Sequence, residues 1–179
     1  MAKIIDKLKE RVNEAAFRLF AEKGYSRVTM KMVAGDVGIS VGTLYNYYSN
    51  KQDLFINASK KVFDQTYLAL EEMLEKNADT YEFLSILYDE VVRLQGFSRE
   101  LLRDKINHEA IDEIKKHLMT LMRSLFYKVK VTEIENIPDR DKDRTIRMLF
   151  LAMHDFAREY PDDREGNIEY FCRLREIIK

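Results

Sequence analysis

Apolar residues recur every three or four positions along most of this chain, the spacing that places side chains on one face of an α-helix. The repeat is clear from Ile5 to Phe20, and Gly24 follows it as an expected helix end. Beyond the first fifty residues the same spacing predicts helices at 51–76, 79–96, 111–131, 141–160 and 163–178. Gly96 is expected to end the second of these five, and a shorter helix is expected after Ser98. The pattern therefore predicts an all-α protein.

Residues 29–47 have a different pattern, that of two short helices crossing at a tight turn. Thr29 and Ser40 are expected N-caps, since a hydroxyl there accepts from the free N–H groups of the first helical turn. Gly38 stands where the chain leaves the first short helix, a position that favours positive φ. Ala34 allows a close approach of the two backbones, and Leu44 is expected to pack back onto the first helix. Such a pair presents a rigid helix end to the major groove of DNA.

Residues 10–58 resemble the DNA-binding region of the TetR (tetracycline-repressor-like) family of bacterial transcription regulators. The resemblance is carried by Ala15-Ala16-Phe17-Arg18-Leu19-Phe20-Ala21-Glu22-Lys23-Gly24-Tyr25, Thr29, Val33-Ala34, Val37-Gly38-Ile39-Ser40, Gly42-Thr43-Leu44-Tyr45, Tyr47-Tyr48 and Lys51-Gln52-Asp53-Leu54-Phe55. The chain departs from the family pattern at Gly35 and Asp36, where a more helix-favouring pair is usual, at Tyr48 for Phe, and at Ser49 for Lys. The resemblance implies a three-helix, helix-turn-helix DNA-binding head, residues 1–50. A long helix would join it to a helical-bundle domain for effector binding and dimerisation, residues 51–179.

Ten residues of the head are candidates for DNA contact. They are Thr29, Lys31, Ser40, Val41, Gly42, Thr43, Tyr45, Asn46, Tyr47 and Lys51. Val41 and the Thr43 methyl are suited to a thymine methyl, and Lys31 to a guanine edge or a phosphate. Tyr45, Tyr47 and Lys51 are expected to hold phosphates, which fixes register without reading sequence. Tyr48 is instead expected to pack in the core, one turn after Leu44.

Charge is distributed unevenly between these two parts. The formal net charge is −1, yet residues 1–54 contain nine Lys/Arg against six Asp/Glu. A basic head on an acidic remainder is typical of a DNA-binding module attached to another domain. No apolar run approaches the length of a membrane span, and the N-terminus lacks a signal-peptide pattern. With Cys172 as the single cysteine, a cytoplasmic location without disulfides is expected.

The second part of the chain offers weaker candidates. Arg93, Arg103 and Phe126 are candidates for an effector pocket that takes a small hydrophobic or anionic compound. The densely apolar run at 145–156 and the last helix predict a twofold four-helix interface between two chains. Its expected residues are Leu149, Phe150, Met153, Phe171 and Leu174. His108, His117 and His154 lack metal-ligand spacing, so no metal or other cofactor is expected.

The combined hypothesis is a transcription regulator, most simply a ligand-responsive repressor that binds a palindromic operator on double-stranded DNA as a homodimer. One alternative is a DNA-binding module without small-molecule control. The other is an enzyme on a helical bundle, for which no nucleophile–base pair or phosphate loop is visible. A non-enzymatic protein is therefore expected.

Overall fold

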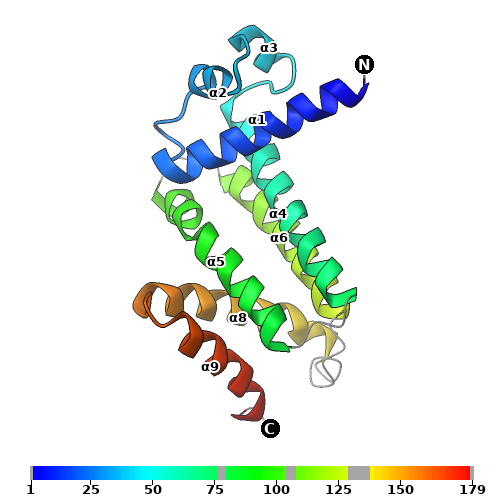
Figure 1. Ribbon diagram of the computed structural model, residues 1–179, viewed down its shortest axis with the longest axis vertical. Helices are drawn as coiled ribbons and strands as arrows, with labels where there is room; N and C mark the ends of the chain where they lie inside the picture. The colour runs from blue at the N-terminus through cyan, green and yellow to red at the C-terminus, as the bar shows by residue number, and fades with distance from the viewer. Residues whose placement is uncertain (1, 76–79, 104–107, 129–137, 178–179) are drawn as a thin grey trace. The chain divides into compact units, whose positions relative to one another are not determined.

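The computed structural model describes residues 2–75, 80–103, 108–128 and 138–177, which form eight α-helices and no strand (Figure 1). The chain divides into two compact units. Unit 1 comprises Met1–Gln65 with Gly96–Leu118, and unit 2 comprises Thr66–Gln95 with Met119–Lys179. The prediction of an all-α fold is confirmed.

Unit 1 begins with three helices whose ends follow the expected signals. Helix α1 is Ala2–Lys23, α2 is Met30–Val37 and α3 is Val41–Tyr45. Gly24 follows α1 with φ 82°, and Gly38 follows α2 with φ 77°. Both glycines thus adopt the left-handed conformation that is cheap for glycine alone.

Helix α4, Lys51–Glu75, starts directly after this trio and contributes residues to both units. Its first turns pack in the core of unit 1, where the Phe55 ring lies edge-on to Phe20 at 4.9 Å and to Tyr25 at 5.0 Å between centroids. Leu44 and Leu54 are completely buried in the same unit. The turn after α1, helix α3 and the first turns of α4 therefore share one apolar core.

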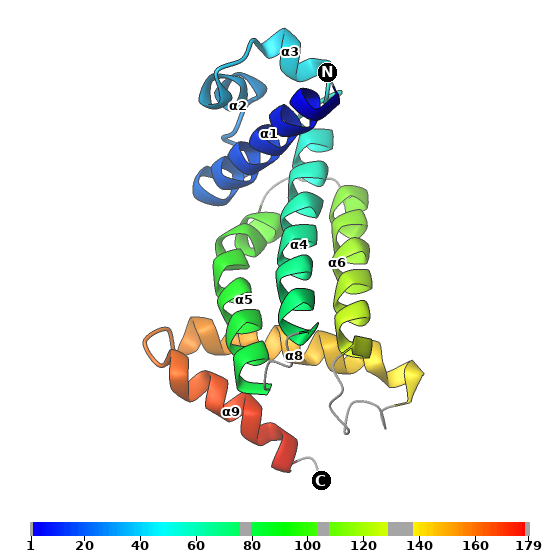
Figure 2. The same cartoon turned by 45° about the vertical axis from the view of Figure 1, so that its right-hand side comes forward.

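Helix α5, Thr80–Arg103, differs from the prediction, because it passes through Gly96 without a break. The separate shorter helix after Ser98 is likewise part of α5. A single glycine lowers helix stability by only about 1 kcal/mol, which neighbouring turns offset when no cap or proline accompanies it. Helix α6, His108–Lys128, follows, and its first half runs beside α4 in unit 1 (Figure 2). A connection is predicted at 133–139; residues 133–137 lie outside the described part of the chain, and the last residue, Asp139, is already helical.

Unit 2 is completed by α8, Asp139–Glu159, and α9, Arg164–Ile177. Met153 and Ile168 are fully buried in its core. Polar contacts join α9 to α5. The Asn167 amide donates to the buried Tyr88 hydroxyl at 2.8 Å. The Arg164 guanidinium donates to both oxygens of the Asp89 carboxylate at 2.7 Å. These contacts fix α9 against α5.

Candidate nucleic-acid interface

The turn between α2 and α3 is built as the sequence predicts. The Thr29 hydroxyl caps α2 by accepting from the Met32 amide at 3.2 Å. At the other end the Ile39 amide donates to the Ala34 carbonyl at 2.9 Å, a bond that the left-handed Gly38 makes possible. These local contacts define where α2 stops and where α3 starts.

Helix α3 is short and depends on its cap and on one anchor. The Ser40 hydroxyl accepts from the Thr43 amide at 3.0 Å and lies 2.8 Å from the Thr43 hydroxyl. Leu44 anchors the helix, since its side chain is fully buried in the core of unit 1. With Leu44 turned inward, the remaining side chains of α3 face outward.

Every one of the ten predicted DNA-contacting residues is exposed or half-buried. The exposed ones are Thr29, Lys31, Ser40, Gly42, Tyr45 and Asn46, and the half-buried ones are Val41, Thr43, Tyr47 and Lys51. Tyr45 is the clearest case, because a large aromatic side chain remains 51% exposed. Eight of the ten lie between Ser40 and Lys51, on α3 and the segments that flank it. The other two are Thr29, the N-cap of α2, and Lys31 on α2.

Lys51 has intramolecular partners that the sequence does not reveal. Its ammonium donates to the Tyr25 carbonyl at 2.9 Å and lies 4.3 Å from the centre of the Tyr25 ring. The group therefore also holds the turn after α1, and its assignment to phosphate stays a prediction. Beside it, Asn50 caps α4 by accepting from the Asp53 amide at 2.9 Å, and Asp53 accepts from the Ser49 amide at 2.8 Å. These two bonds fix the start of α4.

Tyr48 is buried, as predicted, and its hydroxyl has a buried partner. The hydroxyl donates to Asn13 Oδ1 at 2.7 Å, and Tyr48 and Asn13 are 1% and 5% exposed. Burial raises the pKa of the Tyr48 phenol to about 12, because the phenolate would lose its hydration. Sequence reasoning missed Asn13, although a polar residue between the apolar positions Val12 and Ala16 is a signal of a buried polar contact.

A second polar link joins α1 to α2 on the surface. Arg18 pairs with Asp36 at 2.6 Å, and Arg11 donates to the Val37 carbonyl at 2.9 Å. The hydrogen bond from Arg18 to Asp36 and the attraction between their charges raise the pKa of the Arg18 guanidinium. The departure from the family pattern at Asp36 thus has a local role, since its carboxylate joins the C-terminal end of α2 to α1.

The effector and interface candidates lie apart from the head in sequence. The Arg93 guanidinium pairs with Glu90 and also donates to the Thr66 hydroxyl at 3.2 Å. The side chains of Arg103 and Phe126 lie outside the described residues. Among the interface candidates, Met153 and Phe171 are buried inside unit 2, whereas Leu149, Phe150 and Leu174 are half-buried.

The most exposed apolar side chains of α8 are not among the predicted interface residues. Met148 is 51% exposed and Leu151 is 67% exposed. Sequence spacing alone does not distinguish the face of a helix that packs inside its own chain from the face left for a partner.

The described segments offer neither a metal-ion cluster nor a membrane-spanning helix. Those segments contain no group of three or more His, Cys, Asp or Glu side chains placed to hold a metal ion. His117 instead pairs with Asp64 at 2.7 Å. No helix among the described residues is long and apolar enough to cross a membrane.

Comparison with known proteins agrees with this geometry. The family model for bacterial regulatory proteins of the tetR family matches residues 13–58, which begin in α1 and end in α4. The HTH-type transcriptional regulator SAR2658 of Staphylococcus aureus (strain MRSA252) is 26% identical over 122 residues. That match covers 66% of this chain and 60% of the relative.

Two solved structures share the fold over nearly the whole chain. The fatty acid degradation regulator FadR from Bacillus halodurans has a TM-score of 0.66 at 18% identity and covers 93% of both chains. FadR from Bacillus subtilis, solved in complex with stearoyl-CoA, has a TM-score of 0.61 at 20% identity, covering 89% of this chain and 95% of that one. Identities this low show a common fold. The family match adds that residues 13–58 form a helix-turn-helix segment of the type found in bacterial regulatory proteins of the tetR family.

Proposed function

We propose that this protein is a sequence-specific DNA-binding transcription regulator, a repressor that acts as a homodimer. The observation that carries the proposal is the construction of α3. Leu44 and the Ser40 cap hold this helix rigidly, while Val41, Thr43 and Tyr45 remain available on its surface. A supported helix with free polar and small apolar side chains is the arrangement that reads base edges in a major groove.

Recognition divides between two groups of side chains in this proposal. Val41 and Thr43 contact base edges and carry the sequence preference, whereas Tyr45 and Tyr47 contact phosphates. Lys31 is the strongest electrostatic candidate, because it is exposed on α2 and no described residue pairs with its ammonium.

Dimerisation follows from the geometry of a palindromic operator. A single five-residue recognition helix contacts few base pairs, so two copies are needed for specific affinity. The exposed Met148 and Leu151 of α8, with the half-buried Leu149, Phe150 and Leu174, supply an apolar surface for the second chain.

The proposal assigns residues 1–50 to DNA binding and residues 51–179 to dimerisation and effector binding. Helix α4 is the covalent connection, since it starts at Lys51 and has residues in both units. The fold shared with an acyl-CoA-bound FadR suggests acyl-CoA compounds as first effectors to test. The protein is proposed to be cytoplasmic and non-enzymatic.

Fluorescence anisotropy of a labelled duplex, titrated at several salt concentrations, tests DNA binding and the role of Lys31 together. Lys31→Ala should weaken binding and lower the log–log salt slope by about 0.9 if the ammonium neutralises one phosphate. Lys115→Ala is the matched control, because Lys115 is also an exposed lysine and lies on α6. An unchanged slope for Lys31→Ala, or an equal loss in the control, would contradict the phosphate contact.

Effector control is tested separately. Thermal stability and DNA affinity are measured with and without a panel of acyl-CoA compounds. Stabilisation together with lower DNA affinity supports a ligand-responsive repressor. DNA binding that no compound alters favours a module without small-molecule control.

A further inference from the structure

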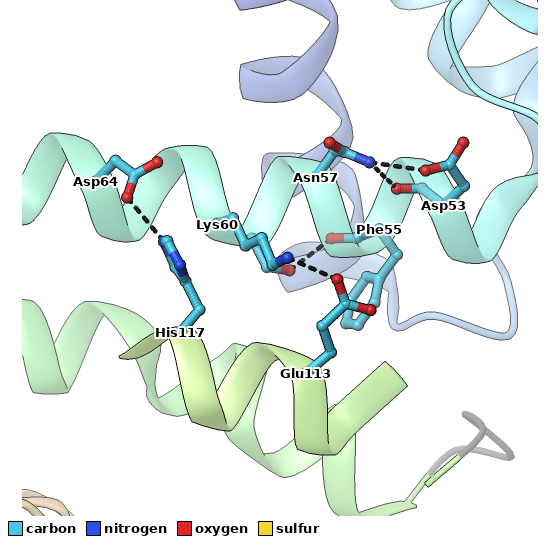
Figure 3. Close-up of polar contacts among 8 residues, drawn as sticks. Asp53, Phe55, Asn57, Lys60, Asp64, Glu113 and His117 are labelled. Atoms are coloured by element: carbon cyan, nitrogen blue, oxygen red, sulfur yellow. Dashed lines mark hydrogen bonds and ion pairs between the residues drawn. The ribbon is translucent and has the colours of Figure 1, made fainter. Parts of the chain in front are cut away.

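A polar groove lies in unit 1, between α1, the first half of α4 and the first half of α6. Its volume is about 510 Å³, within the range of about 300–1,000 Å³ that is usual for small-molecule sites. Lys9, Glu10 and Asn13 line it from α1. Asn57, Lys60, Lys61 and Asp64 line it from α4, and His117 from α6. Figure 3 shows the polar contacts of Asn57, Lys60, Asp64 and His117.

The spacing of these residues explains why they meet. Lys9 and Asn13 are four apart on α1, and Lys60, Lys61 and Asp64 lie three, four and seven positions after Asn57 on α4. Residues at such intervals share one face of a helix. Every lining residue has a polar or charged side chain, so the groove offers several hydrogen-bonding groups to a ligand.

Most charges at this groove are already paired. Lys60 contacts Glu113 at 2.6 Å, Lys61 contacts Glu10 at 3.6 Å, and His117 contacts Asp64 at 2.7 Å. Lys9 is different, because it is exposed and has no hydrogen-bonding or ionic partner among the described residues. Among the lysines that line the groove, Lys9 is thus the one whose ammonium has no partner within the described residues.

Asn13 provides the second and stronger sign of a ligand. Its side chain is 5% exposed, and its carbonyl oxygen accepts from Tyr48 at 2.7 Å. The amide N–H groups of Asn13 have no acceptor among the described residues. Buried donors in folded proteins are rarely left unpaired, since water or a ligand satisfies them. A donor of this kind in the wall of a groove points to an acceptor within the groove.

Asn57 adds a hydrogen-bond acceptor to the groove. Its amide donates to the Asp53 carbonyl at 2.9 Å and to the Asp53 carboxylate at 2.7 Å, which leaves its own carbonyl oxygen as an acceptor (Figure 3). The groove therefore offers an ammonium and an amide donor for an anionic group, and an amide acceptor for a hydroxyl or amine.

We propose that this groove binds a small organic anion that carries a phosphate or carboxylate group and at least one hydroxyl. The anionic group lies between the Lys9 ammonium and the Asn13 amide. The ammonium groups of Lys60 and Lys61, which also line the groove, add electrostatic attraction. The hydroxyl donates to Asn57. Any effect of this ligand on DNA binding, through the bond from Asn13 to Tyr48, rests on the function proposed above, so the site is tested without DNA.

Isothermal titration calorimetry of the full chain uses three probes: inorganic phosphate, citrate and adenosine monophosphate. We expect saturable binding of at least one probe at one site per chain. Binding of inorganic phosphate and adenosine monophosphate, but not of citrate, assigns the site to phosphate compounds. Binding of citrate alone assigns it to carboxylates. Absence of saturable heat with all three at millimolar concentration would overturn the proposal.

Two variants and a control test whether the probe binds in the groove. Lys9→Ala should weaken binding about fivefold, the upper range for an exposed ion pair. Lys7→Ala, an exposed lysine on α1 two residues away, should leave affinity unchanged. Asn13→Asp keeps the acceptor for Tyr48 but replaces the free amide with a second oxygen, and should abolish binding. Circular dichroism verifies that each variant folds, and if Asn13→Asp does not, Lys9→Glu replaces it. Equal affinities of the Lys9 and Lys7 variants would place the anion elsewhere and contradict the proposal.

Discussion

Two glycines of the helix-turn-helix are expected to respond in opposite directions to the same substitution. Gly35 lies inside α2, is exposed, and has helical φ. A Cβ added there meets no atom within 4 Å. Replacing glycine by alanine inside a helix removes backbone freedom from the unfolded chain, so Gly35→Ala should raise the free energy of unfolding by about 0.5–1 kcal/mol.

Gly38→Ala is the matched control, three residues along the chain. A Cβ at Gly38 also meets nothing within 4 Å, so the two sites differ in backbone conformation and not in space. Gly38 has φ 77°, where an L-residue with a side chain is strained by roughly 1–2 kcal/mol. Gly38→Ala should therefore lower the free energy of unfolding, and the two variants should differ by about 2 kcal/mol or more.

Urea unfolding followed by circular dichroism measures both free energies, and hydrogen exchange of the α2 amides shows whether the change is in the head. The expected result is slower exchange in α2 for Gly35→Ala and faster exchange for Gly38→Ala. If Gly35→Ala destabilised the protein, or if both variants shifted it equally, the assignment of α2 and its left-handed end would be refuted.

Three further predictions concern the buried tyrosine, the dimer and base recognition. Burial raises the pKa of Tyr48 from 10.0 to about 12, so the folded state holds the phenol proton more tightly. The free energy of unfolding should then fall as pH rises from 10 to 12, by about 1.4 kcal/mol per pH unit. Tyr48→Phe should remove this part of the alkaline slope in urea titrations, and an unchanged slope would refute the assignment. Leu151→Glu, at a side chain that is 67% exposed, should fold and sediment as a monomer; a folded dimer would place the interface elsewhere. Val41→Ala should change the preferred base pairs while leaving affinity for random duplex unchanged, and an equal loss on both DNAs would make Val41 structural.

The parts of the head that the sequence predicts correctly are those set by local contacts. The Thr29 and Ser40 caps, and the left-handed Gly24 and Gly38, involve partners within a few residues, so the residue types alone indicate them. Gly96 shows the limit of such signals, because α5 continues through it where no cap or proline supports a stop.

Contacts between residues distant in sequence were not predictable in the same way. Lys51 bonds Tyr25 and Tyr48 bonds Asn13 across 26 and 35 residues, and these partners are set by the tertiary packing of the helices in unit 1. The apolar run on α8 illustrates the same difficulty. Met153 is buried in its own unit while Leu151 is exposed, although both are apolar residues of one dense repeat.

Selection of bound sites from random double-stranded DNA tests the central claim most directly, because it needs no prior operator. We expect enrichment of one palindrome whose half-sites are about one helical turn apart, since two α3 helices of a twofold dimer would each read one half-site. Loss of the palindrome with Thr43→Ala, under the same selection, would connect the motif to α3. Recovery of no enriched sequence, or of a motif unaffected by changes on α3, would contradict the account.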